Sequence, residues 1–71
     1  MADDGKVYRV TEVVGTSTDS VQQAVRNAVK RAGETLRNLD WFEISEVRGT
    51  IEDGEVGEFQ VAVKIGFRLD G

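Results

Sequence analysis

The sequence predicts an α+β fold in which a three-stranded antiparallel sheet packs on one helix, with the elements in the order strand, helix, strand, strand. Three observations predict it. Apolar residues recur at helical spacing in one segment only, between residues 21 and 39. Residues 58–69 alternate apolar and polar side chains, as a strand with one covered face does. An Asp-Gly pair at 53–54 is typical of a hairpin turn.

The first strand is predicted at residues 6–14, which are rich in β-branched side chains. Apolar residues occur at both parities within it, so we expect both faces to be partly covered. Residues 15–20 then break the strand and start the helix. A Ser or Thr there can cap the free N–H groups, and Asp19 suits the positive end of the helix. Which of these residues is the cap stays open.

The helix carries a single apolar face with the spacing i, i+3, i+4, i+7. Its members are Val21, Ala24, Val25, Ala28, Val29, Ala32, Leu36 and Leu39. Because most of them are Ala or Val, the helix can lie close to a sheet. Gly33 interrupts the pattern at a cost of about 1 kcal/mol relative to Ala. Asn38 or Asp40 is expected near the end of the helix.

The second strand is predicted at residues 41–51. Its apolar residues do not keep to one parity: Phe42 and Ile44 share one face, whereas Trp41 and Val47 share the other. This mixture predicts either a β-bulge or a strand covered on both sides.

The third strand is predicted at residues 58–69, after a turn at residues 52–57. If the helix returns the chain so that the first two strands run parallel, the third fits between them, antiparallel to both, in the order 1-3-2. One helix covers only one face of such a sheet. The other face, with Gln60, Lys64 and Arg68, is expected to be solvated or to meet other subunits or a ligand.

The length of 71 residues predicts one domain, residues 1–71, with a loose N-terminus at residues 1–5. A chain this short buries only about 60% of its unfolded surface. It has no Cys, which excludes disulfides, and no His, the commonest metal ligand and general base. Oligomerisation is the stabilising device that remains, although some domains of this size fold alone.

The net charge of −4 argues against nucleic acid or an anionic membrane as the main partner. No apolar run approaches the ~20 residues of a membrane span. Residues 1–5 are acidic and lack the basic and apolar regions of a signal peptide. A cytoplasmic protein is the simplest interpretation, and secretion by another route stays open.

Four short segments, taken in order and spacing, resemble the dodecin family. They are Leu39-Asp40-Trp41-Phe42-Glu43, Val47-Arg48-Gly49-Thr50-Ile51, Glu58-Phe59-Gln60-Val61 and Gly66-Phe67-Arg68-Leu69. The resemblance runs from about Lys6 to Leu69. Dodecins are small flavin-binding proteins that assemble into hollow shells of twelve chains. The resemblance therefore implies the same fold, a homododecamer and a flavin such as FMN, riboflavin or FAD.

The resemblance also implies four cofactor-binding residues. Trp41 would stack on the flavin ring system, and Gln60 would read its pyrimidine edge with an amide donor and acceptor. Arg48 and Arg68 would contact the ligand. Some archaeal dodecins lack the arginine that matches Arg48. Each has a plainer interpretation, since Trp41 can anchor the helix end to the sheet and the other three can be ordinary surface residues. Lys6 and Tyr8 also match the bacterial pattern but are expected to have structural roles.

Spacing separates these four residues into two corners. Gln60 and Arg68 are eight residues apart on one strand, roughly 26 Å, and Trp41 and Arg48 roughly 23 Å. A turn near Gly54 would place Trp41 near Arg68 and Arg48 near Gln60. One flavin mononucleotide does not reach both corners of one chain, so a complete site would combine corners from different chains.

The resemblance implies a protein that stores or sequesters flavin. The alternative is a small homo-oligomeric assembly module that binds another cofactor, such as coenzyme A, or none. An enzyme is not expected, because no P-loop, dinucleotide fingerprint, nucleophile elbow or metal-ligand spacing is present and no proton-transfer group stands out.

Overall fold

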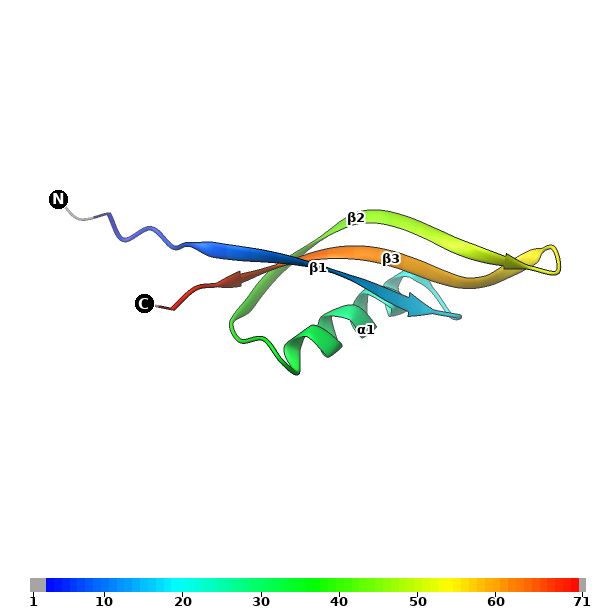
Figure 1. Ribbon diagram of the computed structural model, residues 1–71, viewed down its shortest axis with the longest axis horizontal. Helices are drawn as coiled ribbons and strands as arrows, with labels where there is room; N and C mark the ends of the chain where they lie inside the picture. Colours follow the sequence, from blue (N-terminus) through cyan, green and yellow to red (C-terminus); the bar gives the residue numbers. More distant parts are fainter. Residues whose placement is uncertain (1–2, 71) are drawn as a thin grey trace.

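The computed structural model describes residues 3–70 and contains the four predicted elements (Figure 1). They are β1 (Tyr8–Ser17), α1 (Val21–Gly33), β2 (Leu39–Glu52) and β3 (Glu55–Arg68). The sheet order is β1-β3-β2, and β3 is antiparallel to both neighbours. The predicted fold class and strand order are therefore confirmed. Of residues 1–5, predicted to be loose, Met1 and Ala2 lie outside the described residues, and residues 3–5 form neither helix nor strand. Residues 6 and 7, predicted as the start of the first strand, lie outside β1, which begins at Tyr8.

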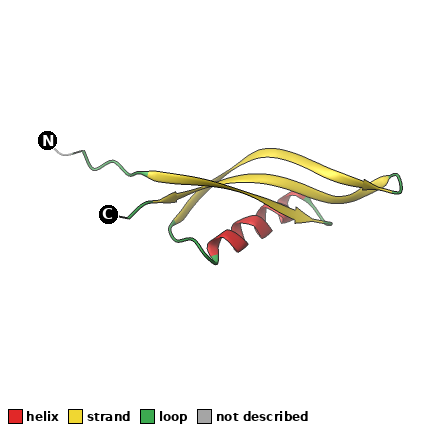
Figure 2. Ribbon diagram, in the orientation of Figure 1, coloured by secondary structure: helices red, strands yellow, loops and turns green. Residues whose placement is uncertain are grey.

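The molecule is a long ribbon with the helix against one side, measuring 62 × 21 × 14 Å (Figure 2). Both chain ends lie at one end of the ribbon, and the β2–β3 hairpin forms the other end (Figure 1). Asp53 and Gly54 form the turn with φ values of 53° and 79°, the left-handed values that a two-residue hairpin turn requires. No helix in the described part of the chain is long and apolar enough to cross a membrane.

The boundary between β1 and α1 differs from the prediction. Gly15 does not break the strand: it pairs with Val61, and β1 continues to Ser17. A Cβ atom on Gly15 would lie 2.0 Å from the carbonyl oxygen of Ala24. The glycine is therefore needed because the helix approaches the sheet there. The open question of the cap is answered by Ser20, whose hydroxyl accepts a 3.0 Å hydrogen bond from the backbone N–H of Gln23.

The end of α1 also differs, since the helix stops at Gly33 rather than near residue 38 or 40. Leu36 and Leu39 continue the apolar spacing beyond the helix, and both pack on the core from the connection and from the start of β2. The apolar spacing therefore identified the buried residues correctly but predicted too long a helix. Leu36 and Leu39 reach the core from non-helical chain and from β2 instead.

The predicted bulge in β2 is present. The pairing of β2 with β3 shifts between Ile44 and Glu46, and this shift brings Val47 onto the same face as Phe42 and Ile44. Trp41 stays on the opposite face. The parity of Val47 is thus explained by the shift between Ile44 and Glu46, and the pairing shifts again between Leu39 and Trp41 and between Gly49 and Ile51.

The core is small and lies between α1 and β3. Its buried residues are Ala24, Val25, Ala28, Ala32, Val61, Val63 and Ile65. The helix leaves β2 largely uncovered, so Phe42 remains 53% exposed although it faces the helix side. Within residues 3–70, no element covers the opposite face of the sheet, as predicted, and this face holds the candidate site.

Candidate functional site

The open face of the sheet brings together two groups of candidate residues. We call Tyr8, Asp40, Trp41, Gly66 and Arg68 the tryptophan corner, and Glu46, Arg48, Glu58 and Gln60 the glutamine corner. Register places Trp41 opposite Gly66, and Arg48 opposite Gln60. Residues directly opposite one another point to the same face. The predicted division of the four site residues into two corners is therefore confirmed, while their roles toward a ligand stay predictions.

The indole of Trp41 lies against the backbone of β3 at Gly66. A Cβ atom on Gly66 would be 2.1 Å from Cε2 of the indole and 2.3 Å from Cζ2. Only a glycine leaves space for the ring at this position. The side chain is nevertheless 41% exposed, because the open face has no layer above it. The arrangement supplies a flat aromatic surface that is already in place and accessible to a planar ligand.

Tyr8 holds the tryptophan corner from the neighbouring side. Its ring centroid is 6.2 Å from that of Trp41 at an interplanar angle of 54°. Its hydroxyl donates a 2.7 Å hydrogen bond to Oδ2 of Asp40, the residue that precedes the tryptophan. This hydrogen bond is the main cause that raises the pKa of Tyr8 above its ordinary value of 10.0, and the charge of Arg68 opposes the shift. Tyr8 therefore lies beside the indole of Trp41 and is hydrogen-bonded to Asp40, the residue before it.

Arg68 lies at the end of β3, opposite Tyr8 in the register. Its backbone N–H donates a 3.0 Å hydrogen bond to the carbonyl of Asn38, which fixes the strand end beside the start of β2. The side chain is exposed and shares the face of Trp41. A guanidinium beside an exposed indole suits a ligand that is flat and carries negative charge.

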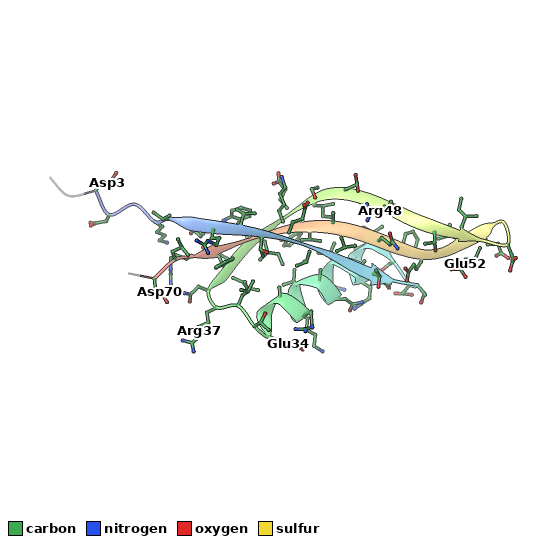
Figure 3. The ribbon with its side chains drawn as sticks, in the orientation of Figure 1. Asp3, Glu34, Arg37, Arg48, Glu52 and Asp70 are labelled. Atoms are coloured by element: carbon green, nitrogen blue, oxygen red, sulfur yellow. The ribbon has the colours of Figure 1, made fainter. Side chains whose placement is uncertain are left out.

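The glutamine corner is a chain of polar contacts. Nε of Arg48 donates a 3.0 Å hydrogen bond to Oε1 of Gln60, and its Nη1 forms an ion pair with Glu46. Nε2 of Gln60 donates a 3.2 Å hydrogen bond to Oε1 of Glu58. Both ends of the Gln60 amide are thus occupied within the chain. Figure 3 shows Arg48 on the long hairpin, toward the end that carries Glu52.

The two corners are far apart in one chain. Six residues of β3 separate Gln60 from Gly66, which corresponds to about 20 Å. Glu12, Lys64 and Glu43 form a cross-strand row between the corners. A ligand that stacks on Trp41 therefore meets charged side chains, not Gln60, on its own subunit.

The hollow at the tryptophan corner is small. It has about 120 Å³ and is lined by Asp40 and Trp41 together with Val29, Leu39, Phe42 and Ile65. Ligand pockets usually measure about 300–1,000 Å³. A larger groove of about 730 Å³ lies between α1 and β2, away from the open face. Within residues 3–70, no three acidic side chains gather as a metal site would require.

Sequence reasoning missed two members of the tryptophan corner, Gly66 and Asp40. Gly66 had a usable signal, because a glycine inside a strand often marks the close approach of another group. Tyr8 was expected to be structural, which agrees with its contacts. Its pairing with Asp40 spans 32 residues of sequence and could not be read from local pattern.

The fold and the open face together define a small α+β protein with one uncovered face of its sheet. The family model described as Dodecin matches residues 7–70. Since this match covers nearly the whole chain, the chain belongs to the dodecin family. Members of this family are small binding proteins for small-molecule ligands rather than enzymes.

Three relatives illustrate the similarity. Dodecin of Thermus thermophilus is 52% identical over 66 residues, which cover 93% of this chain and 96% of the relative. The structure of dodecin from Streptomyces coelicolor has 64% identity and a TM-score of 0.91, covering 97% of this chain and 99% of that one. The calcium dodecin of Mycobacterium tuberculosis, described with a novel calcium-binding site, has 25% identity and a TM-score of 0.78, covering 90% and 91%.

Proposed function

We propose that this protein binds a flavin, FMN, riboflavin or FAD, and holds it in storage or sequestration without turning it over. The observation that carries the proposal is the indole of Trp41, which lies on Gly66 with 41% of the side chain exposed. Offset stacking on such a ring adds about 0.5–1.5 kcal/mol beyond the burial of apolar area. A ring system as flat as isoalloxazine suits this surface.

The polar residues fit the rest of a flavin. The Gln60 amide offers both a donor and an acceptor to the pyrimidine edge, and Arg48 and Arg68 offer guanidinium groups to a ribityl or phosphate tail. Since Gln60 is hydrogen-bonded to Arg48 and Glu58, a ligand there exchanges existing hydrogen bonds for its own. The net gain from this corner is therefore smaller than the number of polar atoms suggests.

The site is proposed to lie between subunits of a homododecamer. The separation of about 20 Å between the corners favours a ligand that meets Trp41 of one chain and Gln60 of another. The shape of the chain supports assembly. Its radius of gyration is 15.3 Å, whereas a compact domain of 71 residues has about 11 Å. Its accessible surface is 5404 Å², whereas a compact monomer of 7.8 kDa exposes about 4,400 Å².

The same residues argue against chemistry on the ligand. Flat stacking leaves little room for a substrate, and the groups beside Trp41 are a phenol that is hydrogen-bonded to a carboxylate and the guanidinium of Arg68. The tryptophan corner offers one carboxylate, that of Asp40, which accepts a hydrogen bond from Tyr8, whereas calcium takes about 6–8 oxygen ligands. We propose the cytoplasm, where flavin cofactors are made and used, as the location.

Ligand titration of the purified protein tests the proposal. Separate titrations with riboflavin, FMN, FAD and coenzyme A are followed by flavin fluorescence and by calorimetry. Strong quenching of flavin fluorescence, with saturation near one flavin for each chain, is expected. Binding of coenzyme A without any flavin would instead support the assembly module, and a colourless protein that ignores all four ligands would support a module without a cofactor.

A further inference from the structure

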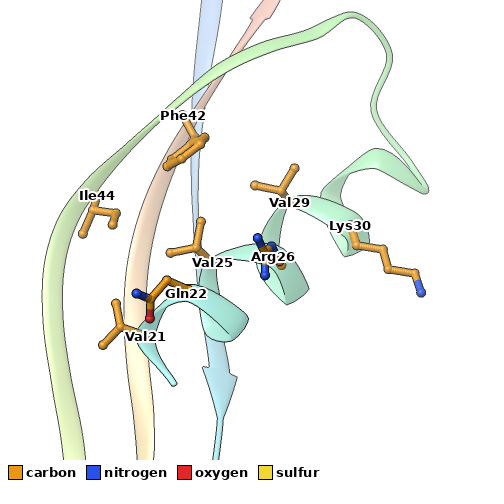
Figure 4. A pocket seen from close by; sticks show the side chains of 8 residues that line it. All are labelled: Val21, Gln22, Val25, Arg26, Val29, Lys30, Phe42 and Ile44. Atoms are coloured by element: carbon orange, nitrogen blue, oxygen red, sulfur yellow. The ribbon is translucent and has the colours of Figure 1, made fainter. Parts of the chain in front are cut away.

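The groove between α1 and β2 exposes apolar side chains that the chain itself does not cover. Val21, Val25 and Val29 of the helix form one wall, and Phe42 and Ile44 of β2 form the other (Figure 4). The groove has a volume of about 730 Å³. A continuous apolar surface of this kind on a soluble domain marks a contact with another molecule.

The rim of this groove is basic. Arg26 and Lys30, on the outer side of α1, belong to its lining. Neither takes part in an ion pair within residues 3–70, where the ion pairs are Arg31 with Glu34 and Arg48 with Glu46. The occupant of the groove is therefore expected to be apolar at its centre and acidic at its edge.

The tip of the β2–β3 hairpin has this combination. Ile51 and Val56 pair across the two strands and are 78% and 63% exposed. Between them the turn carries three exposed acidic residues, Glu52, Asp53 and Glu55. None of the three forms an ion pair within the described residues.

The tip does not reach the β2 wall of the groove in its own chain. Seven residues of β2 separate Ile51 from Ile44 in the groove wall, or about 23 Å along a strand. The hairpin extends away from the helix and forms one end of the 62 Å ribbon (Figure 1). Val21, at one end of the groove, lines a second hollow of about 320 Å³ together with Ile51 and Val56, but the tip does not cover Phe42 and Ile44 in the wall of its own groove.

We propose that the hairpin tip of one copy of this chain occupies the α1/β2 groove of a neighbouring copy. Ile51 and Val56 then lie on the apolar walls, and the acidic turn faces Arg26 and Lys30. The inference rests on the proposed homo-oligomer and names one contact that builds it. Because tip and groove are different surfaces, the contact is head-to-tail, and it closes into a ring when the rotation between copies permits.

Cross-linking between single-cysteine chains tests the contact, since the natural sequence has no Cys and gives a thiol-free background. Glu55→Cys marks the tip and Arg26→Cys marks the groove, each in a chain with a different mass tag. The two chains are refolded together and treated with a short bismaleimide. The expected product is the mixed dimer of one tip chain and one groove chain. The matched control replaces the groove chain by Lys64→Cys, which marks the open face and should give no mixed dimer.

The outcomes separate this contact from the assembly itself. A monomer in light scattering would overturn the proposed oligomer and the contact with it. An intact oligomer with no tip–groove product, or with mainly tip–tip or groove–groove dimers, would overturn the contact alone.

A charge exchange provides an independent measurement. Glu55→Lys at the tip, or Lys30→Glu at the groove, should raise by about tenfold the chain concentration at which the oligomer dissociates, because each places like charges together. The two substitutions in one chain restore opposite charges between neighbours and should recover most of the loss. If the double variant destabilised the oligomer by the sum of the two single effects, the tip and the groove would not be in contact.

Discussion

The two corners of the open face are built differently. The tryptophan corner is held by packing, because the indole lies on Gly66 and beside Tyr8, whose hydroxyl is bound to Asp40. The glutamine corner is held by hydrogen bonds between exposed side chains, with Gln60 between Arg48 and Glu58. A packed aromatic surface exists before a ligand arrives, whereas hydrogen-bonded groups must first exchange partners. We therefore expect affinity to come mainly from the first corner and selectivity from the second.

The largest effect is expected from Trp41→Ala. Loss of a stacked aromatic anchor commonly costs more than about 2 kcal/mol, so flavin affinity should fall at least thirtyfold. The measurement is a fluorescence titration, with light scattering to show that assembly is retained. Trp41→Phe is the matched control, because it keeps an aromatic ring and should lose less. Unchanged affinity in Trp41→Ala would return Trp41 to the role of an anchor between helix and sheet.

Mixed oligomers test whether one ligand uses both corners from different chains. Trp41→Ala and Gln60→Ala are each defective alone, and joint refolding should create some sites with both residues intact and others with both missing. Strong binding should reappear in a fraction of sites. The measurement is a titration after mass spectrometry has confirmed mixing. A site within one chain always carries one defect, so the absence of any tight fraction would contradict the shared site.

The rigidity of the tryptophan corner is tested by Gly66→Ala. The added methyl group overlaps the indole at 2.1 Å and must displace it, with a cost typical of overpacking, about 1–3 kcal/mol. Affinity for flavin should fall, and near-ultraviolet circular dichroism of the single tryptophan should change. Gly33→Ala is the control, because its new Cβ would meet only Leu39 at an ordinary 3.6 Å. Unchanged flavin affinity in Gly66→Ala would show that the packing of the indole on Gly66 does not contribute to binding.

Gln60→Ala should lose less flavin affinity than Trp41→Ala, because Gln60 exchanges hydrogen-bond partners when a ligand binds. Because Gln60 gives up hydrogen bonds within the chain to form those with a ligand, the net loss should be about 0.5–1.5 kcal/mol. Titrations with riboflavin and with lumichrome-type analogues altered at the pyrimidine edge measure both affinity and selectivity. Thr16→Ala, opposite Gln60 on β1, is the control. A loss as large as that of Trp41→Ala would reverse the assignment of affinity to the first corner.

The smallest effect concerns the titration of Tyr8, the single tyrosine of the chain. Its raised pKa means that the folded state favours the protonated phenol, so its contribution to stability is present below pH 10.0 and is lost as the pH rises through the folded value. The midpoint of the pH titration, followed by tyrosinate absorbance, should therefore lie above pH 10.0. Asp40→Ala should lower the midpoint toward 10.0, and Glu43→Ala, which does not contact Tyr8, should leave it unchanged. Equal midpoints in all three proteins would contradict the hydrogen bond.

The sequence by itself determined the fold class, the strand order and the division of the site into two corners. Alternation of side chains in β3 settles which of its residues share a face, and a turn near Gly54 predicts that Arg48 lies near Gln60. The exact pairing also depends on the register shift between Gly49 and Ile51, because the turn alone would place Arg48 opposite Phe59. Periodicity and turn chemistry are local properties, and for that reason they can be read from neighbouring residues.

The tertiary structure decided what local pattern cannot contain. Gly15 continues a strand instead of breaking it because α1 lies against it, and the helix ends at Gly33 although the apolar spacing runs on to Leu39. The packing of the Trp41 indole on Gly66 depends on how closely β2 and β3 approach each other at this point. Contacts of this kind join residues far apart in the chain, and their energy depends on distances of a few ångström that only the folded arrangement sets.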